Sequence, residues 1–239
     1  MLPILAPAQA LISLTTANVI GGSGQWGGSN WDVTGSGYSA LNVVGQQSGA
    51  ISEPTATGYW LGNNGTANEY FVLDLGATYN LSQIDLYNTH NQNANDRATN
   101  AFTIQAANSV SLLKATVDYD LVSGTQILGG TLAFQSAGSD PIEAASYSSG
   151  NGLDNSSNWR YLKFTAVSYF SSGAGLNEIR VYGTAIPEPS AHAASAGAAA
   201  LLLVLFRRRK SGVRQQSRLQ HDKPPARSCP VPGTGGPTG

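Results

Sequence analysis

The sequence predicts an all-β domain, built as an antiparallel β-sandwich, from three observations. Between Trp26 and Gly183, apolar residues alternate with polar ones over short runs, and no apolar period of an α-helix of useful length occurs. Stretches rich in Gly and Asn, such as 62–65 and 149–152, separate these runs as turns. Charged residues make up only 11% of the 239 residues, and β-formers and small polar residues are abundant, which is typical of secreted all-β domains.

The clearest strand is predicted over residues 69–75, where Phe71, Leu73 and Leu75 fall on one face. The same alternation recurs at Ile84 and Leu86, at Phe102, Ile104 and Ala106, at Leu162, Phe164 and Ala166, and at Ile179 and Val181. We expect the apolar face of 71–75 to meet that of 162–164 across the core. The less regular stretch 126–132 predicts a hairpin that turns at two adjacent glycines, Gly129 and Gly130.

The formal charge of −1 is divided unevenly along the chain. Residues 1–186 hold five basic and twelve acidic side chains, whereas residues 207–239 hold eight basic side chains and one acidic one. Nucleic-acid binding by the predicted domain is therefore not expected, because neutralising phosphates requires clustered Lys and Arg. The one cysteine, Cys229, lies in the C-terminal tail, so the domain is expected to have no disulfide and no thiolate metal site.

Few residues of the predicted domain are suited to catalysis. His90 is its one histidine, it contains no cysteine, and no Gly-x-Ser-x-Gly pattern provides a nucleophile elbow. A glycosidase would need two carboxylates facing one cleft. Asp74, Asp85 and Glu178 fall inside predicted strands, where structural roles are expected. We therefore expect no enzymatic activity.

The loop with the sequence NTHNQNANDR, residues 88–97, is the first candidate for ligand binding. Its amides, imidazole, carboxylate and guanidinium provide the directional donors and acceptors that sugar hydroxyls require. The candidate contacts are His90, Asn91, Asn93 and Arg97, of which His90 and Asn91 are expected to be exposed. The alternative is that the asparagines shape the turn, while Asp96 and Arg97 tie the loop to a neighbouring strand.

Aromatic side chains provide a second candidate surface, because flat rings stack on sugar faces and fill sandwich cores equally well. Trp26 and Trp31 lie among Gly, Ser and Asn residues, so we expect both to be partly exposed and available to a ligand. The stretch 59–61, Tyr-Trp-Leu, is expected to lie in the core.

Three stretches together resemble a known family. They are YFVLDLGATYNLSQIDLYNTHN from residue 70, NDRATNAFTIQAA from residue 95, and RYLKFTAVSYFSSGAGLNEIRVYG from residue 160. In this order, over residues 26–183, they resemble the coagulation-factor-V/VIII type C, or discoidin-like, domain. The resemblance implies a galactose-binding-like jelly roll over residues 11–184. It also implies that loops at one end of the sandwich bind glycans, phospholipid headgroups or proteins.

The same resemblance raises the question of a structural calcium ion. Many carbohydrate-binding relatives hold calcium with oxygens of an early loop and a Glu near the last strand, which Glu178 matches. The early loop at 40–45 contains no Asp here, and a hard cation prefers several oxygens, some of them anionic. A calcium site is thus expected to be weakened, and the alternative is that Glu178 pairs with a basic neighbour.

The C-terminal region resembles the PEP-CTERM sorting signal of Gram-negative bacteria. It has Pro187-Glu188-Pro189, then a short apolar helix predicted over 191–206, and then Arg207, Arg208 and Arg209. The helix is shorter than the ~20 residues of a full membrane span. The resemblance implies export, transient anchoring of 191–206 in the inner membrane, and processing by an exosortase-type enzyme. We assign residues 185–210 to this signal.

The two ends of the chain complete the domain organisation. Residues 1–10 are either the truncated end of a signal peptide, with small-x-small sites at 6–8 and 8–10, or no signal at all. Residues 211–239 are rich in Pro, Gly and basic side chains and predict a disordered tail. The expected function is an exported carbohydrate-binding module, with an extracellular polysaccharide or other glycan as partner in the cell envelope or matrix. The alternative is a structural or adhesion protein that makes protein contacts without binding sugar.

Overall fold

The computed structural model describes residues 10–33, 36–53, 58–92, 94–113, 118–136, 138 and 140–187. The chain divides into a compact unit, Met1–Ile186, and a second unit, Pro187–Gly239, of which Pro187 alone is described. Most of the predicted signal segment, the helix at 191–206 and the tail at 211–239 lie outside the described residues. Within them, no helix is long and apolar enough to span a membrane.

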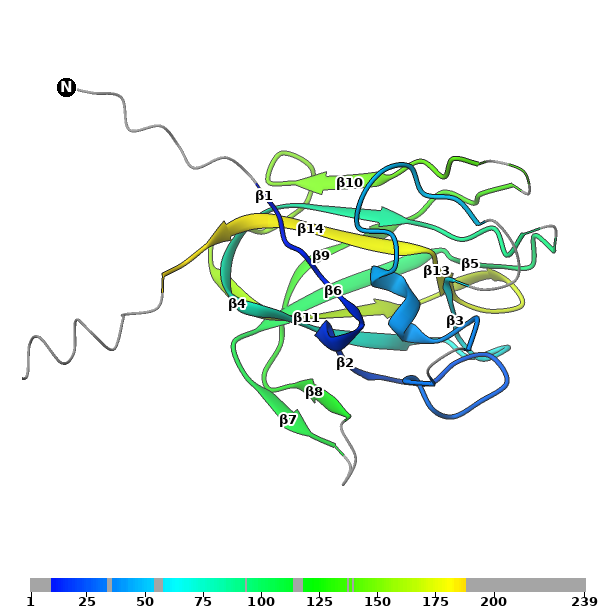
Figure 1. Ribbon diagram of the computed structural model, residues 1–239, viewed down its shortest axis with the longest axis horizontal. Helices are drawn as coiled ribbons and strands as arrows, with labels where there is room; N and C mark the ends of the chain where they lie inside the picture. The colour runs from blue at the N-terminus through cyan, green and yellow to red at the C-terminus, as the bar shows by residue number, and fades with distance from the viewer. Residues whose placement is uncertain are drawn as a thin grey trace, which may run out of the picture. The chain divides into compact units, whose positions relative to one another are not determined.

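The fold is organised by one long strand, β4 (Glu69–Tyr87), of 19 residues. Its first part pairs with β11 (Asn158–Ala166) and β2 (Val19–Gly22), and its second part with β14 (Glu178–Ala185) and β10 (Ala145–Ser148). The change of partners begins near Gly76, where a φ of 82° suits glycine and the Gly76 N–H donates to Asp74 Oδ1 (2.8 Å). The chain thereby passes from one layer of the sandwich to the other (Figure 1).

All these pairings are antiparallel, and they form two layers that share β4. One layer continues from β11 to β6 (Ala101–Ala107) and β9 (Thr125–Thr131), and the other from β14 to β1 (Ala10–Leu11). The prediction of an all-β antiparallel β-sandwich is confirmed.

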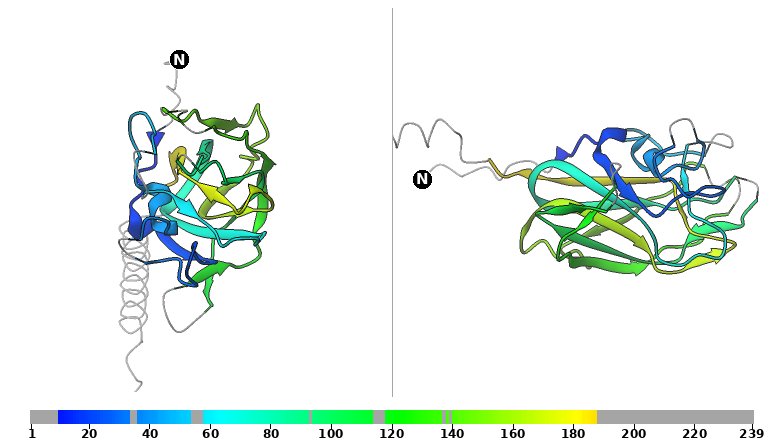
Figure 2. Two further views of the ribbon diagram at one scale, coloured as in Figure 1. Left: turned by 90° about the vertical axis from the view of Figure 1, so that its right-hand side faces the viewer. Right: turned by 90° about the horizontal axis from the view of Figure 1, so that it is seen from below.

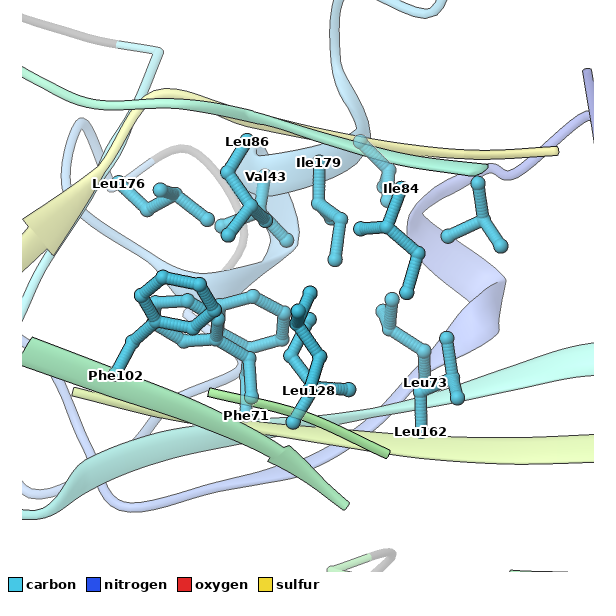
Figure 3. Packing of buried hydrophobic residues seen from close by; sticks show 14 of the residues in the cluster. Val43, Phe71, Leu73, Ile84, Leu86, Phe102, Leu128, Leu162, Leu176 and Ile179 are labelled. Carbon is cyan, nitrogen blue, oxygen red and sulfur yellow. The ribbon is translucent and has the colours of Figure 1, made fainter. Parts of the chain in front are cut away.

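The apolar faces of the two layers pack against each other (Figure 3). Phe71, Phe102 and Leu162 come from one layer, and Ile84 and Ile179 from the other, and all are at most 2% exposed. Phe164 stacks between Phe71 and Phe102, with ring centroids at 5.1 and 5.8 Å. Burial of these rings stabilises the domain, which contains no cysteine and so has no disulfide.

Two expectations about strands were wrong. The faces of 71–75 and 162–164 do not meet across the core, because β4 and β11 are neighbours in one layer, with Leu73 opposite Leu162. The stretch 126–132 is not a hairpin, since β9 pairs with β6 from Thr125 to Thr131. Neither Gly129 nor Gly130 has the positive φ that tight hairpin turns require.

Because β4 folds back on itself, the loops next to both of its ends lie at one end of the sandwich, which we call the loop end. Two short ribbons close it, namely β3 (Trp60–Leu61) with β13 (Gly175–Leu176), and β5 (Arg97–Thr99) with β12 (Tyr169–Ser171). It lies at the right of Figure 1 and faces the viewer in the left view of Figure 2. The hairpin of β7 (Val110–Leu112) and β8 (Tyr119–Leu121) lies away from it. Two 3-10 helices, η1 (Thr16–Asn18) and η2 (Ala40–Val44), complete the fold.

Candidate functional site

Three aromatic side chains lie in contact at the loop end. The rings of Trp26 and Tyr38 meet edge to face with centroids at 5.1 Å, and Tyr38 meets Tyr59 in the same way at 5.6 Å. Trp26 is 43% exposed, whereas Tyr59 is buried. This row of aromatic rings therefore runs from the surface into the protein.

A local turn presents Trp26 to solvent. The Gly28 N–H donates to Gln25 O (3.0 Å), and Gly27, between Trp26 and Gly28, has a φ of 78°. A positive φ at the third residue is the geometry of a type II turn, which glycine adopts without strain. The Trp26 N–H also donates to Leu61 O (2.7 Å), so the turn is fixed to strand β3.

Polar side chains continue from the buried end of the aromatic row. The Tyr59 hydroxyl donates to Asn91 Oδ1 (2.8 Å), and Asn91 Nδ2 donates to the carboxylate of Asp96. The other oxygen of Asp96 lies 3.9 Å from Arg97 Nε. Burial raises the pKa of Tyr59 well above its ordinary value, so its hydroxyl keeps its proton at neutral pH.

Arg97 closes this chain of contacts into a ring. Its Cζ atom lies 4.7 Å from the centroid of the Trp26 ring, and its Nη2 donates to Asn64 Oδ1 (2.5 Å). Arg97 is 5% exposed, and its burial lowers the pKa of the guanidinium, while Asp96 opposes that shift. We call Trp26, Tyr38, Tyr59, Asn91, Asp96 and Arg97 the loop-end ring. In the loop-end ring, the guanidinium of Arg97 packs on one face of the Trp26 indole, and its charge is shielded from solvent because Arg97 is buried.

The backbone of residues 91–97 explains how the loop reaches this ring. Asn91, Gln92 and Asn95 have φ values of 49°, 55° and 52°, and asparagine tolerates this left-handed region better than most residues. The Ser172 N–H donates to Asp96 O (2.7 Å), and β5 pairs with β12 from Arg97 onward. The asparagines thus shape the turn, and Asn91 and Arg97 also contribute side chains to the ring.

His90 is not exposed, contrary to the expectation from sequence. It is 2% exposed, with Nδ1 2.8 Å from Gln92 O and 3.4 Å from a carboxylate oxygen of Glu53. Glu53 also accepts the backbone N–H groups of His90 (3.1 Å) and Gln92 (2.9 Å). Asp140 Oδ1 lies 3.7 Å from His90 Nε2 on the other side. His90 therefore joins three loops from within and presents no ring to a ligand.

Trp31 is also buried, at 7% exposed, and belongs to the main core. Its carbonyl accepts the Ser39 hydroxyl (2.6 Å) and the Ala40 N–H (3.1 Å). These hydrogen bonds attach Trp31 to the start of η2. Only Trp26 of the predicted pair is available to a ligand. Asn93 lies outside the described residues. Residues 59–61 are buried, as expected. The sequence did not point to Tyr38, which contacts Trp26, and Asn64, which binds Arg97, was marked only by the Gly-Asn-Asn-Gly turn at 62–65.

Glu178 lies elsewhere, under the loop that follows η2. It is fully buried, and its carboxylate accepts the Gln46 N–H (2.9 Å) and the side-chain amide of Gln47. Two carbonyls of this loop are bound by Arg180, whose Nη2 donates to Gln46 O (2.6 Å) and Gly49 O (2.7 Å). The residues do not fit calcium, because a guanidinium already supplies the positive charge. Among the described residues, no group of three His, Cys, Asp or Glu side chains could hold a metal.

We expect Arg180→Met to lower the free energy of unfolding by about 2–4 kcal/mol, because it leaves buried carbonyl groups without donors. Addition of calcium or of a chelator is expected to leave the Tm of the unaltered protein unchanged. Thermal unfolding followed by circular dichroism measures both effects. Arg160→Met, which removes the half-exposed partner of Asp74, is the matched control and is expected to cost about 0–1 kcal/mol. A Tm that rises with calcium would contradict this assignment.

Burial raises the pKa of Glu178 to about 8, although the hydrogen bonds from Gln46 and Gln47 act in the opposite direction. The folded protein therefore holds a proton that the unfolded chain, with a pKa of about 4.3, releases. With respect to this group, the free energy of unfolding should be highest below about pH 4.3, and it should fall by roughly 4–5 kcal/mol as the pH rises to 8. Urea unfolding across this range is expected to show the decrease, and Glu178→Gln should remove it. An unchanged pH dependence in Glu178→Gln would contradict the shift.

Comparison with known proteins leaves the family of the chain open. The sequence matches no protein-family model and no curated protein. The structure is similar to the family 32 carbohydrate-binding module of C. perfringens NanJ, solved with galactose, at 13% identity over 73% of this chain and 99% of that one (TM-score 0.47). It is also similar to the C-terminal domain of a Bacteroides fragilis chitobiase, at 13% identity over 73% and 99% of the two chains (TM-score 0.45). Allantoicase from Saccharomyces cerevisiae gives 14% identity over 71% of this chain and 45% of the enzyme (TM-score 0.45). Similarities at this level do not identify a ligand.

Proposed function

We propose that the chain is a non-enzymatic carbohydrate-binding module whose ligand stacks on Trp26. The observation that carries the proposal is a tryptophan that is 43% exposed, although the buried guanidinium of Arg97 and the ring of Tyr38 hold it in place. An exposed aromatic ring fixed in this way needs no reordering when a sugar packs on it. Its rigidity distinguishes it from an incidental surface tryptophan.

The surroundings of Trp26 supply the polar half of a sugar site. Asn64 is exposed, and the Asp96 side chain is 35% exposed, and both are held by contacts to Arg97. An amide and a carboxylate offer donors and acceptors to the hydroxyl groups of a sugar. A small number of fixed polar groups beside an aromatic ring is the usual composition of a specific ligand site.

Affinity electrophoresis of the full chain in gels that contain soluble polysaccharides tests the proposal. Retarded migration is expected in at least one neutral or basic polysaccharide, and free sugar should reverse it. Migration that no polysaccharide retards would contradict carbohydrate binding and would favour the second function given below.

We also propose that the module is exported and sorted to the cell envelope or extracellular matrix. The support is the order of three features along the chain, namely Pro187-Glu188-Pro189, the apolar segment 191–206 and the basic residues Arg207 to Arg209. Of these residues, the structure describes only Pro187. An exosortase-type enzyme would process the chain near 187–189 after residues 191–206 enter the inner membrane. Fractionation of cells that produce the natural chain or Glu188→Ala tests this. Equal release of both proteins would contradict processing at this site.

A second function, adhesion through protein contacts, is favoured by a different surface. Leu112, Leu113 and Val122, in and beside the β7–β8 hairpin, are between 43% and 51% exposed. Exposed apolar groups of this kind occur at protein interfaces. Sedimentation of the full chain should reveal self-association that Leu112→Ser weakens if this second function applies, and a monomer at all concentrations would contradict self-adhesion.

A further inference from the structure

A second exposed aromatic ring lies at the loop end, outside the loop-end ring. Among the described residues, the two most exposed aromatic residues are Trp26, at 43%, and Phe134, at 42%. The ring of Phe134 meets that of Phe170 edge to face, with centroids at 5.3 Å. Because Phe170 belongs to β12, one of the strands that close the loop end, Phe134 lies at the same end of the sandwich as Trp26.

The backbone next to Phe134 is held by a buried side chain. Asn88 is 2% exposed, and its side-chain amide donates to Ala133 O (2.9 Å) and to Thr99 O (2.8 Å). It thereby attaches the residue before Phe134 to β5, the strand that begins at Arg97. An exposed ring on a segment that is already fixed loses little conformational entropy when a ligand packs on it.

A pocket of about 160 Å³ opens beside Phe134. It is lined by Ala133 and Gln135, the residues on either side of Phe134, and by the exposed Glu143. The amide and the carboxylate in this lining can donate to and accept from the hydroxyl groups of a sugar. An exposed ring beside a small pocket with a few polar groups has the usual composition of a ligand site.

The ribbon of β5 and β12 connects the two exposed rings. Arg97 packs on Trp26, with Cζ 4.7 Å from the centroid of the indole, and it pairs with Ser171. Ser171 follows Phe170, which contacts Phe134. Given the spacing of paired strands and the lengths of the side chains, these contacts place the rings of Trp26 and Phe134 at most about 30 Å apart. Ser171, between them, is exposed, so an extended ligand can pass over the ribbon at this residue.

We propose that the ligand is a linear glycan of several sugar units, of which one unit stacks on Trp26 and a later one stacks on Phe134. This inference rests on the proposed carbohydrate site at Trp26 and names its class of ligand, a segment within a polysaccharide chain and not a single terminal sugar. Two modest contacts joined in one ligand reinforce each other, because the second contact is intramolecular once the first has formed.

Calorimetric titration of the full chain with oligomers of two, four and six sugar units tests the inference. The oligomers are made by partial hydrolysis of the polysaccharide that retards the natural chain most strongly in affinity electrophoresis. The six-unit oligomer should bind roughly tenfold more tightly than the two-unit one, because only the longer chain can contact both rings. Equal affinity for all three lengths would overturn the inference and leave the site at Trp26 standing. If no polysaccharide retards the chain, the proposed function fails, and this inference fails with it.

Variants separate the gain with chain length from sugar binding itself. Phe134→Ala should reduce the gain between two and six units to about twofold or less, whereas Phe134→Trp, which keeps a ring at this position, should preserve it. Trp26→Ala should weaken the binding of all three oligomers. Leu112→Ala, which shortens a side chain of a 51% exposed residue in β7, away from the loop end, is the matched control and should keep the full gain. A full gain in folded Phe134→Ala would overturn the inference.

Discussion

Trp26→Ala is expected to weaken glycan binding at least about 30-fold, the usual consequence of losing an aromatic residue at the centre of a binding site. The indole supplies the stacking surface, and its removal also exposes the guanidinium of Arg97 to water. Because Trp26 is 43% exposed, the fold should lose little, and its Tm should remain within a few degrees of the natural value. Calorimetric titration with the polysaccharide that retards the natural chain most strongly measures the change.

Trp31→Phe is the matched control for this variant. Trp31 lies five residues further along the chain but is buried in the core, so its replacement should lower the Tm and leave binding by the folded protein intact. If Trp31→Phe abolished binding while Trp26→Ala bound fully, the assignment of the site to the loop-end ring would be contradicted.

Phe164→Ala is expected to have the largest effect on stability, a loss of about 3–5 kcal/mol in the free energy of unfolding. Phe164 is 1% exposed and stacks between Phe71 and Phe102, and it meets Trp60 edge to face with ring centroids at 6.2 Å. Its removal leaves a cavity between rings that the β-strands hold in place, so the core cannot close around it. Urea unfolding measures the loss.

Phe134→Ala is the control for Phe164→Ala, because Phe134 is 42% exposed and packs against one ring, that of Phe170. It should cost less than about 1 kcal/mol. Similar losses in the two variants would contradict the assignment of Phe164 to the centre of the core.

The local pattern of the sequence was enough to predict the sandwich. Alternation in 69–75, 102–106, 162–166 and 179–181 identified strands, and all four occur in the structure. The pairing of these strands was beyond prediction, because alternation fixes which side chains share a face and leaves the neighbouring strand undetermined. The glycines at 129 and 130 lie within β9 and have no positive φ, although their sequence is typical of a turn.

The candidate site was predicted only where it depended on local sequence. Asn91, Arg97 and Trp26 are in the loop-end ring, but His90 is buried because Glu53 and Asp140, distant in sequence, enclose it. Trp26 and Trp31 lie in similar sequences, and only long-range contacts separate the exposed ring from the buried one. Arg180 binds the carbonyls of Gln46 and Gly49, residues more than 130 positions away in the sequence, and alternation within 179–181 could not predict these long-range partners.

The most direct test of the carbohydrate site is the two-dimensional nitrogen–proton spectrum of the four tryptophan indoles during titration with a retarding glycan. A ligand that stacks on the loop-end ring should shift the Trp26 indole signal in a saturable manner. The signals of Trp31 and Trp159 should stay in place, because Trp31 is buried in the core and Trp159 lies at the start of β11, away from the loop end. The Trp60 signal should shift less than that of Trp26, because Trp60 is buried, although its Nε1 donates to Gly24 O (3.3 Å) next to the turn that carries Trp26. Saturable shifts at Trp159 without a shift at Trp26, or no indole shift with a glycan that demonstrably binds, would contradict the account.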